Sequence, residues 1–218
     1  MPPRDVPGPT AAQTLADTLR TRILAGDAAP GSPLREEDLA QEYGLSRHTV
    51  RTALASLGAE RLVEIAPYRG ARVADLDDDG VAALQELRAA LESEAVRILR
   101  ARHGEVWPAS VRDPMDAAVA ALAAAEVSGD WLATTLAHAA VHRTIVEAAG
   151  SARITQAHAQ LESEVLLLLT HLRPEYPQGS FAAQHNEYLA QIQMRGADAV
   201  REHLEHSTAL IRAARRAV

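Results

Sequence analysis

Histidines that could bind a metal ion are concentrated in the later part of the chain, where eight of the nine follow residue 100. His138 and His142 are four residues apart, so on a helix they lie one turn apart on the same face. Two imidazoles at this spacing can bind one metal ion. His203 stands among apolar residues and should point inward, where an imidazole without a partner is costly. These apolar neighbours are Ala199, Val200, Leu204, Leu210 and Ile211.

A metal site on a helix could also serve hydrolysis, because a bound metal can activate water. In the zinc-protease pattern a glutamate between the two histidines is the general base. Here the residues between His138 and His142 are Ala139, Ala140 and Val141, and no nucleophile lies near another base in the sequence. The sequence therefore favours binding over catalysis, and we expect that the protein is not an enzyme.

A second chemical group is the arginine-bearing run from residue 46 to 51, Ser-Arg-His-Thr-Val-Arg. A recognition helix offers its N-terminal side chains to base edges while flanking arginines hold phosphates. Arg47 can bind a guanine through two hydrogen bonds, and Arg51 follows one turn later. We expect contacts to double-stranded DNA from Arg35, Ser46, Arg47, His48, Thr49, Arg51, Arg69 and Gly70.

Three helices and a hairpin must position these side chains. Helical periodicity covers residues 14–25 and 35–43, and each stretch ends at a glycine. Ser46 is a suitable N-cap for a third helix, whose Val50, Ala53, Leu54 and Leu57 share one face. The short apolar segments 62–65 and 71–73 flank a turn at residues 67–70. This order predicts a winged helix-turn-helix over residues 14–75, preceded by a disordered leader at residues 1–13.

Residues 76–80 are acidic and break the pattern, which marks them as a linker. From residue 81 to 218 the periodicity is helical throughout, with interruptions at 104–108, 129, 150, 174–179 and 196. About six helices with short connections are typical of an antiparallel bundle. The predicted fold is therefore mainly α: a winged helix-turn-helix followed by an all-α bundle.

Composition limits the possible functions. The net charge of −7 argues against a general polyanion binder. Residues 10–75 contain eight arginines and nine carboxylates, so DNA binding should depend on a few positioned, salt-sensitive contacts. The absence of cysteine excludes disulfides and thiolate metal sites. The Pro-rich start is unlike a signal peptide, and no apolar run approaches the roughly 20 residues of a membrane span. We expect a cytoplasmic protein without a membrane segment.

Seven short stretches between residues 14 and 74 form one pattern: LRTRILAGD from Leu19, PGSPL from Pro30, EDLA from Glu37, GLSR from Gly44, then VR, AL and RGARV. This pattern resembles the GntR family of bacterial transcription regulators. His48 and Thr49 depart from it, since many relatives have a small residue and proline there. The resemblance implies a homodimeric regulator, a repressor, that reads an inverted repeat in its operator.

A second pattern comprises LQELRAALE at residues 84–92, the segment 142–150, Gln184-His185 and REHL at residues 201–204. It resembles the FadR C-terminal (FCD) domain found in one branch of that family. Metal-binding members use three histidines and an aspartate four residues before the first. The resemblance thus implies His142, His185 and His203 as ligands, with His138 in the place of the aspartate. An all-imidazole set favours zinc, or nickel, over manganese.

Some assignments within this resemblance have alternatives. His206 could replace His203 as the last ligand, but its flanks are polar, so we prefer His203. The open coordination position would accept the carboxylate of a small organic acid, with Arg88 as its partner; alternatively, Arg88 forms a surface salt bridge. In another interpretation the metal itself is the signal. We interpret His103, His158 and His171 as surface or core residues.

Overall fold

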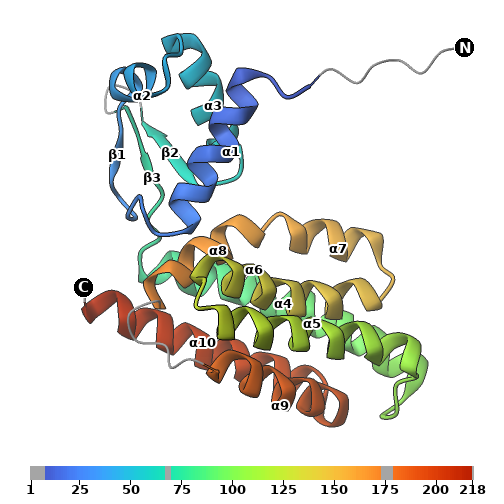
Figure 1. Ribbon diagram of the computed structural model, residues 1–218. Helices are drawn as coiled ribbons and strands as arrows, with labels where there is room; N and C mark the ends of the chain where they lie inside the picture. Colours follow the sequence, from blue (N-terminus) through green and yellow to red (C-terminus); the bar gives the residue numbers. More distant parts are fainter. Residues whose placement is uncertain (1–7, 67–69, 173–178, 218) are drawn as a thin grey trace, which may run out of the picture. The chain divides into compact units, whose positions relative to one another are not determined.

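The computed structural model describes residues 8–66, 70–172 and 179–217 (Figure 1). The chain divides into two compact units, residues 1–75 and residues 76–218. Each unit has its own core, and each is described by itself. None of the helices in these described ranges combines the length and the apolar character needed to cross a bilayer.

The first unit begins with helix α1 (Ala11–Leu24), which starts three residues before the predicted position. The side chain of Thr10 accepts a hydrogen bond from Gln13 N–H, and the Gln13 side chain accepts one from Thr10 N–H. This capping box satisfies two backbone groups that a helix start otherwise leaves free. The prediction of a disordered leader is therefore wrong for residues 11–13, while residues 1–7 lie outside the described part.

Helices α2 (Glu36–Tyr43) and α3 (Arg47–Ala59) form the helix-turn-helix. Gly44 ends α2 in the left-handed region, at φ +64°, where residues with a Cβ are strained. Ser46 then caps α3, because its side chain accepts a hydrogen bond from Thr49 N–H. The predicted inner face of α3 is buried against α1 and α2; it consists of Val50, Ala53, Leu54 and Leu57.

Three short strands complete the first unit, in the order β1-β3-β2. Strands β2 (Val63–Ala66) and β3 (Gly70–Val73) are antiparallel, which confirms the predicted hairpin; the turn at residues 67–69 lies outside the described residues. Strand β1 (Pro33–Leu34) lies between the first two predicted helices, where no strand was predicted. Its two residues pair with Arg72 and Ala71, and a strand this short has no periodicity to reveal it.

The second unit is a helical bundle, and its first helix, α4 (Asp78–His103), begins inside the predicted linker. Asp77 accepts a hydrogen bond from Gly80 N–H at 2.8 Å and so caps the helix. Asp78 and Asp79 follow in the first turn, where negative charge is favourable. The acidic run that suggested a linker is therefore a helix start from residue 77 onward.

The remaining helices are α5 (Ala109–Ser128), α6 (Trp131–Ala148), α7 (Ala152–Ala159), α8 (Glu162–Leu169), α9 (Ser180–Arg195) and α10 (Ala197–Ala217). A 3-10 turn (Thr170–Leu172) follows α8. The single helix predicted after residue 150 is two helices, α7 and α8, which meet at Gln160 and Leu161. Helix α6 packs against α4, α5, α7, α8 and α9, so its inward side chains lie at the centre of the bundle (Figure 1).

Candidate metal centre and nucleic-acid interface

Three buried histidines from two helices meet inside the bundle. His138 and His142 extend from one face of α6, and His185 comes from α9. Each offers a ring nitrogen, and these three atoms lie within 4.8 Å of one another. The spacing of four residues thus brings His138 and His142 together, and the later helix supplies the third imidazole.

The protons of two of these rings are fixed by their neighbours. His142 Nδ1 donates to Glu92 Oε2 at 2.8 Å, and His185 Nδ1 donates to the Phe181 carbonyl oxygen at 2.7 Å. Burial lowers the pKa of His142 and lowers that of His185 to about 3, so each neutral ring has one proton. Both Nε2 atoms therefore have bare lone pairs, and these atoms lie 3.1 Å apart.

Two lone pairs that face each other at this distance repel unless a cation lies between them. Two imidazoles on one tetrahedral metal, with bonds of about 2.0–2.1 Å, have nitrogens about 3.3 Å apart. His138 Nδ1 is also buried and has no hydrogen-bond partner among the described residues. An unpartnered ring nitrogen beside two bare ones is a donor set that fits a metal ion.

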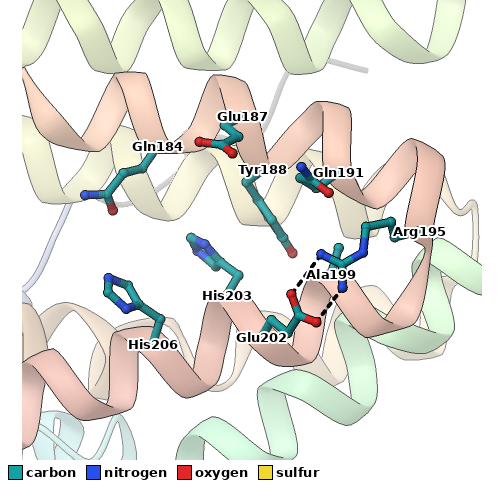
Figure 2. Close-up of a pocket in the computed structure, with 9 residues that line it drawn as sticks. All are labelled: Gln184, Glu187, Tyr188, Gln191, Arg195, Ala199, Glu202, His203 and His206. Carbon is teal, nitrogen blue, oxygen red and sulfur yellow. Dashed lines mark hydrogen bonds and ion pairs between the residues drawn. The ribbon is translucent and has the colours of Figure 1, made fainter.

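His203, the fourth predicted ligand, lies next to this group but outside it. Its ring centroid is 5.0 Å from that of His185 and 5.3 Å from that of His142. It stacks on Tyr188 at 4.1 Å. Both rings border a pocket of about 390 Å³ between α9 and α10, where the exposed His206 also lies (Figure 2). His203 therefore stands between the histidine cluster and a solvent-facing pocket.

Glu92 organises the other side of the cluster. Its carboxylate is completely buried and accepts from His142, from His158 Nε2 at 3.2 Å and from Tyr188 Oη at 3.4 Å. Arg88 Nη2 lies 3.1 Å from Glu92 Oε1. Burial alone would raise the pKa of Glu92, but His142 and Arg88 hold it well below its usual range. The carboxylate is therefore charged and fixes the His142 proton on Nδ1.

Arg88 is only 3% exposed, so the alternative of a surface salt bridge is wrong. Its guanidinium also donates to Gln85 Oε1 at 2.8 Å. Three histidines were interpreted as surface or core residues. Of these, His158 is buried and contacts Glu92, and His103 is half-buried, while the structure does not describe the His171 side chain. The spacing of four residues between Arg88 and Glu92 indicates an ion pair on one helix face, but it does not indicate that the pair is buried.

A long-range cap sets the start of α9, the helix that contains His185. The Glu126 carboxylate, on α5, accepts hydrogen bonds from Phe181 N–H and Ala182 N–H, both at 3.0 Å. Gly179, the N-cap residue, has no side chain for this purpose. Because Phe181 also accepts the His185 proton, Glu126 fixes a residue that orients a histidine of the cluster.

In the first unit, five of the predicted DNA contacts lie at the exposed start of α3: Ser46, Arg47, His48, Thr49 and Arg51. Arg51 donates to both carboxylate oxygens of Glu36, at 3.1 and 2.9 Å, and Arg47 contacts Glu37. Ser46 Oγ and Thr49 Oγ1 lie 2.9 Å apart, while His48 is exposed. Of the others, Arg35 lies 3.7 Å from Asp38, Gly70 is exposed at φ +78°, and Arg69 lies outside the described residues.

Comparisons with known proteins find matches for both units of the chain. Residues 11–73 match the family described as "Bacterial regulatory proteins, gntR family", and residues 83–209 match the FCD domain. The transcriptional repressor GlaR of Escherichia coli K12 is 31% identical over 66% of this chain and 65% of its own length. The probable D-xylose utilization operon repressor of Paenarthrobacter nicotinovorans is 27% identical over 92% of this chain and 86% of its own.

Solved structures share the fold. A structural-genomics crystal structure assigned to GntR, from Rhodococcus sp. RHA1, has a TM-score of 0.72 at 22% identity and covers 92% of this chain and 96% of its own. Escherichia coli McbR/YncC has a TM-score of 0.67 at 18% identity, with coverage of 93% and 97%. With both domains matched in order, the chain belongs to the GntR family of bacterial regulatory proteins, in the branch with an FCD domain, and is a DNA-binding transcriptional regulator rather than an enzyme.

Proposed function

We propose that the chain is a cytoplasmic repressor whose bundle binds a divalent metal ion and a small organic acid, and whose winged units bind an inverted repeat as a homodimer. His138, His142 and His185 would hold the metal, and His203 would complete the set from α10. The main support is that the Nε2 atoms of His142 and His185 lie 3.1 Å apart and both have bare lone pairs, because the Nδ1 atoms of these rings donate to other groups. Such a pair is stabilised by a cation.

The donor set indicates the metal. All proposed ligand atoms are imidazole nitrogens, which suit zinc or nickel, and no carboxylate from the cluster favours manganese. Bound to three imidazoles, such an ion would supply a Lewis-acidic fourth position that an effector carboxylate can occupy; with His203 also bound, the carboxylate would need a fifth position. The chain orients the rings for it, through Glu92 on His142 and the Phe181 carbonyl on His185.

The pocket between α9 and α10 is the proposed effector site. Its volume of about 390 Å³ would accommodate a small organic acid, and it is bordered by His203 and Tyr188 (Figure 2). The His203 ring is 5.0 Å from that of His185, and the Tyr188 ring is 5.6 Å from that of His142. Arg88 is the proposed partner of the effector carboxylate. Its guanidinium contacts Glu92 and Gln85, and a guanidinium has five N–H donors, so donors remain for a ligand.

The exposed start of α3 would enter the major groove, with Arg47 and Arg51 on base edges and Ser46, His48 and Thr49 beside them. Arg35, Arg69 and Gly70 would contact the flanking backbone. An effector controls this binding only if it binds the DNA-competent and DNA-incompetent arrangements with different affinity.

The metal assignment can be tested by elemental analysis of purified protein. Alanine at both His142 and His185 should abolish stoichiometric zinc or nickel, because it removes the two bare Nε2 donors. His103→Ala is the matched control, since this half-buried histidine at the end of α4 lies outside the group of ring nitrogens that meet. Unchanged metal content in the double variant would contradict the site.

The regulatory assignment needs a duplex obtained by in-vitro selection on the wild-type protein. Affinity for it should change when a chelator removes the metal, and change again when a series of small carboxylic acids is added to the metal-loaded protein. A response to metal but to no acid in the series would favour the alternative in which the metal is the signal. Failure to select any sequence would contradict DNA reading.

A further inference from the structure

The recognition helix presents its arginines already paired with acids of the preceding helix. Arg51 donates from Nε and Nη2 to the two oxygens of Glu36, and Arg47 Nη2 contacts Glu37. Glu36 and Glu37 are the first two residues of α2, while Arg47 is the first residue of α3. The two helices therefore bring two carboxylates to the surface that is to face DNA.

These pairs are weak constraints on the fold. Arg47, Glu37 and Arg51 have side chains that are 62%, 69% and 66% exposed, and exposed ion pairs contribute about 0–1 kcal/mol at most. The main effect of these pairs is that each carboxylate offsets the positive charge of its arginine. Residues 10–75 contain eight arginines and nine carboxylates, and six of these arginines form described ion pairs.

A paired guanidinium still has hydrogen-bond donors available. The contact with Glu36 uses one N–H of Arg51 Nε and one of Nη2, out of the five that a guanidinium has. The remaining edge can donate to the O6 and N7 acceptors of guanine, which have no net charge. Attraction to a phosphate is different, because it depends on the net charge of the pair, and a neighbouring carboxylate cancels it.

We propose that Glu36 and Glu37 are specificity-determining residues: by neutralising Arg51 and Arg47 they suppress binding to the phosphate backbone of any sequence while leaving base reading intact. This inference rests on the proposed placement of α3 in the major groove. A random duplex lacks the matching base edges, so phosphates are the main acceptors that it offers to these arginines. The selected sequence also offers base edges, so the carboxylates weaken binding to random DNA more than binding to the selected site.

The test uses the full chain and two fluorescent duplexes of about 30 base pairs, one of random sequence and one selected on the wild-type protein, titrated over a range of salt. The variants are Glu36→Gln, Glu37→Gln and the double substitution, which keep side-chain size and hydrogen-bond acceptance. Glu60→Gln is the matched control. It removes one charge and an ion pair with Arg20, but Glu60 caps the other end of α3, about 20 Å from Arg47.

The double variant should bind the random duplex about tenfold more tightly at about 0.1 M salt, since each carboxylate a few ångströms from a phosphate, after screening by salt, should weaken binding about threefold. The slope of log affinity against log salt should steepen by about 1–2. The selected duplex should gain less than about threefold, so discrimination falls, and Glu60→Gln should change every affinity less than about twofold.

Two outcomes would overturn the inference: random-duplex affinity within twofold of wild type, or equal gains on both duplexes. Arg47→Ala separates this failure from failure of the proposed function. It should weaken selected-duplex binding by about 5–150-fold, and full retention of affinity would show that α3 does not read DNA. Thermal unfolding of each variant, monitored by circular dichroism, verifies that the first unit is folded.

Discussion

At the residue scale, Glu92 sets the proton on His142, and this gives a prediction for metal binding. Glutamine at position 92 keeps the shape of the side chain but removes its negative charge. That charge holds the His142 proton on Nδ1 and pairs with Arg88. Orienting partners of this kind change metal affinity by about 10–100-fold when mutated. We therefore expect Glu92→Gln to weaken zinc binding by that factor, measured by competition with a chromogenic chelator.

Glu94→Gln is the control for this substitution. Glu94 lies two residues along the same helix, pairs with the exposed Arg97 and faces away from the histidines. Its zinc affinity should equal that of the wild type. If Glu92→Gln bound zinc as tightly as Glu94→Gln, the orienting role of Glu92 would be wrong.

The same residue shows what the sequence alone could not reveal. His138 and His142 could be predicted as a pair from the sequence, because a spacing of four residues is local to one helix. A glutamate in a helix is usually exposed, so nothing local marks Glu92 as buried. Its burial depends on Arg88 from the same helix together with His142 and His158 from α6 and α7. Tyr188 adds a donor from α9, so the packing of four helices creates that environment.

At the element scale, α9 depends on a cap from another helix. Glu126 is 5% exposed and accepts the N–H groups of Phe181 and Ala182. Alanine at 126 would leave buried donors unpaired, which costs about 1–3 kcal/mol. We expect Glu126→Ala to lower the free energy of unfolding by that amount in urea denaturation. Glu105→Ala, at a position with a 73% exposed side chain, should change it by less than about 0.5 kcal/mol.

Elements were predictable where their signals are local. The inner face of α3 and its Ser46 cap could be derived from one stretch of sequence, as could the hairpin. Strand β1 could not, because Pro33 and Leu34 are extended only through pairing with β3. The break between α7 and α8 has no proline or glycine to signal it. Both failures concern structure that distant segments impose.

At the scale of the whole molecule, the buried histidines predict acid sensitivity of the metal-free protein. Burial lowers the pKa of His185 to about 3 and also lowers those of His138, His142 and His203. Unfolded histidine titrates near 6.5, so below that pH the unfolded state binds protons that the folded state does not. His185 alone should therefore reduce stability by about 1.4 kcal/mol between pH 7.5 and 5.5.

Urea denaturation of the metal-free protein across this pH range measures the effect. Below about pH 4.5 Glu92 should add to this loss of stability, since its pKa is lowered in the folded state and protonation therefore favours the unfolded state. His185→Leu should flatten the pH dependence, whereas His206→Gln, at an exposed position, should leave its slope unchanged. Equal stability at pH 7.5 and 5.5 would contradict the burial of neutral imidazoles.

Two copies of the chain are needed to read an inverted repeat, because each copy reads one half-site. With eight arginines against nine carboxylates in residues 10–75, a single half-site contact should be weak, and linking two such contacts raises the effective concentration of the second. Light scattering at micromolar concentration should therefore give twice the 23.4 kDa of one chain. Mixed dimers of wild-type and Arg47→Ala chains should bind the selected duplex with intermediate affinity, while a duplex containing only one half-site should bind weakly. A monomeric mass, or equal affinity for one and two half-sites, would exclude paired reading.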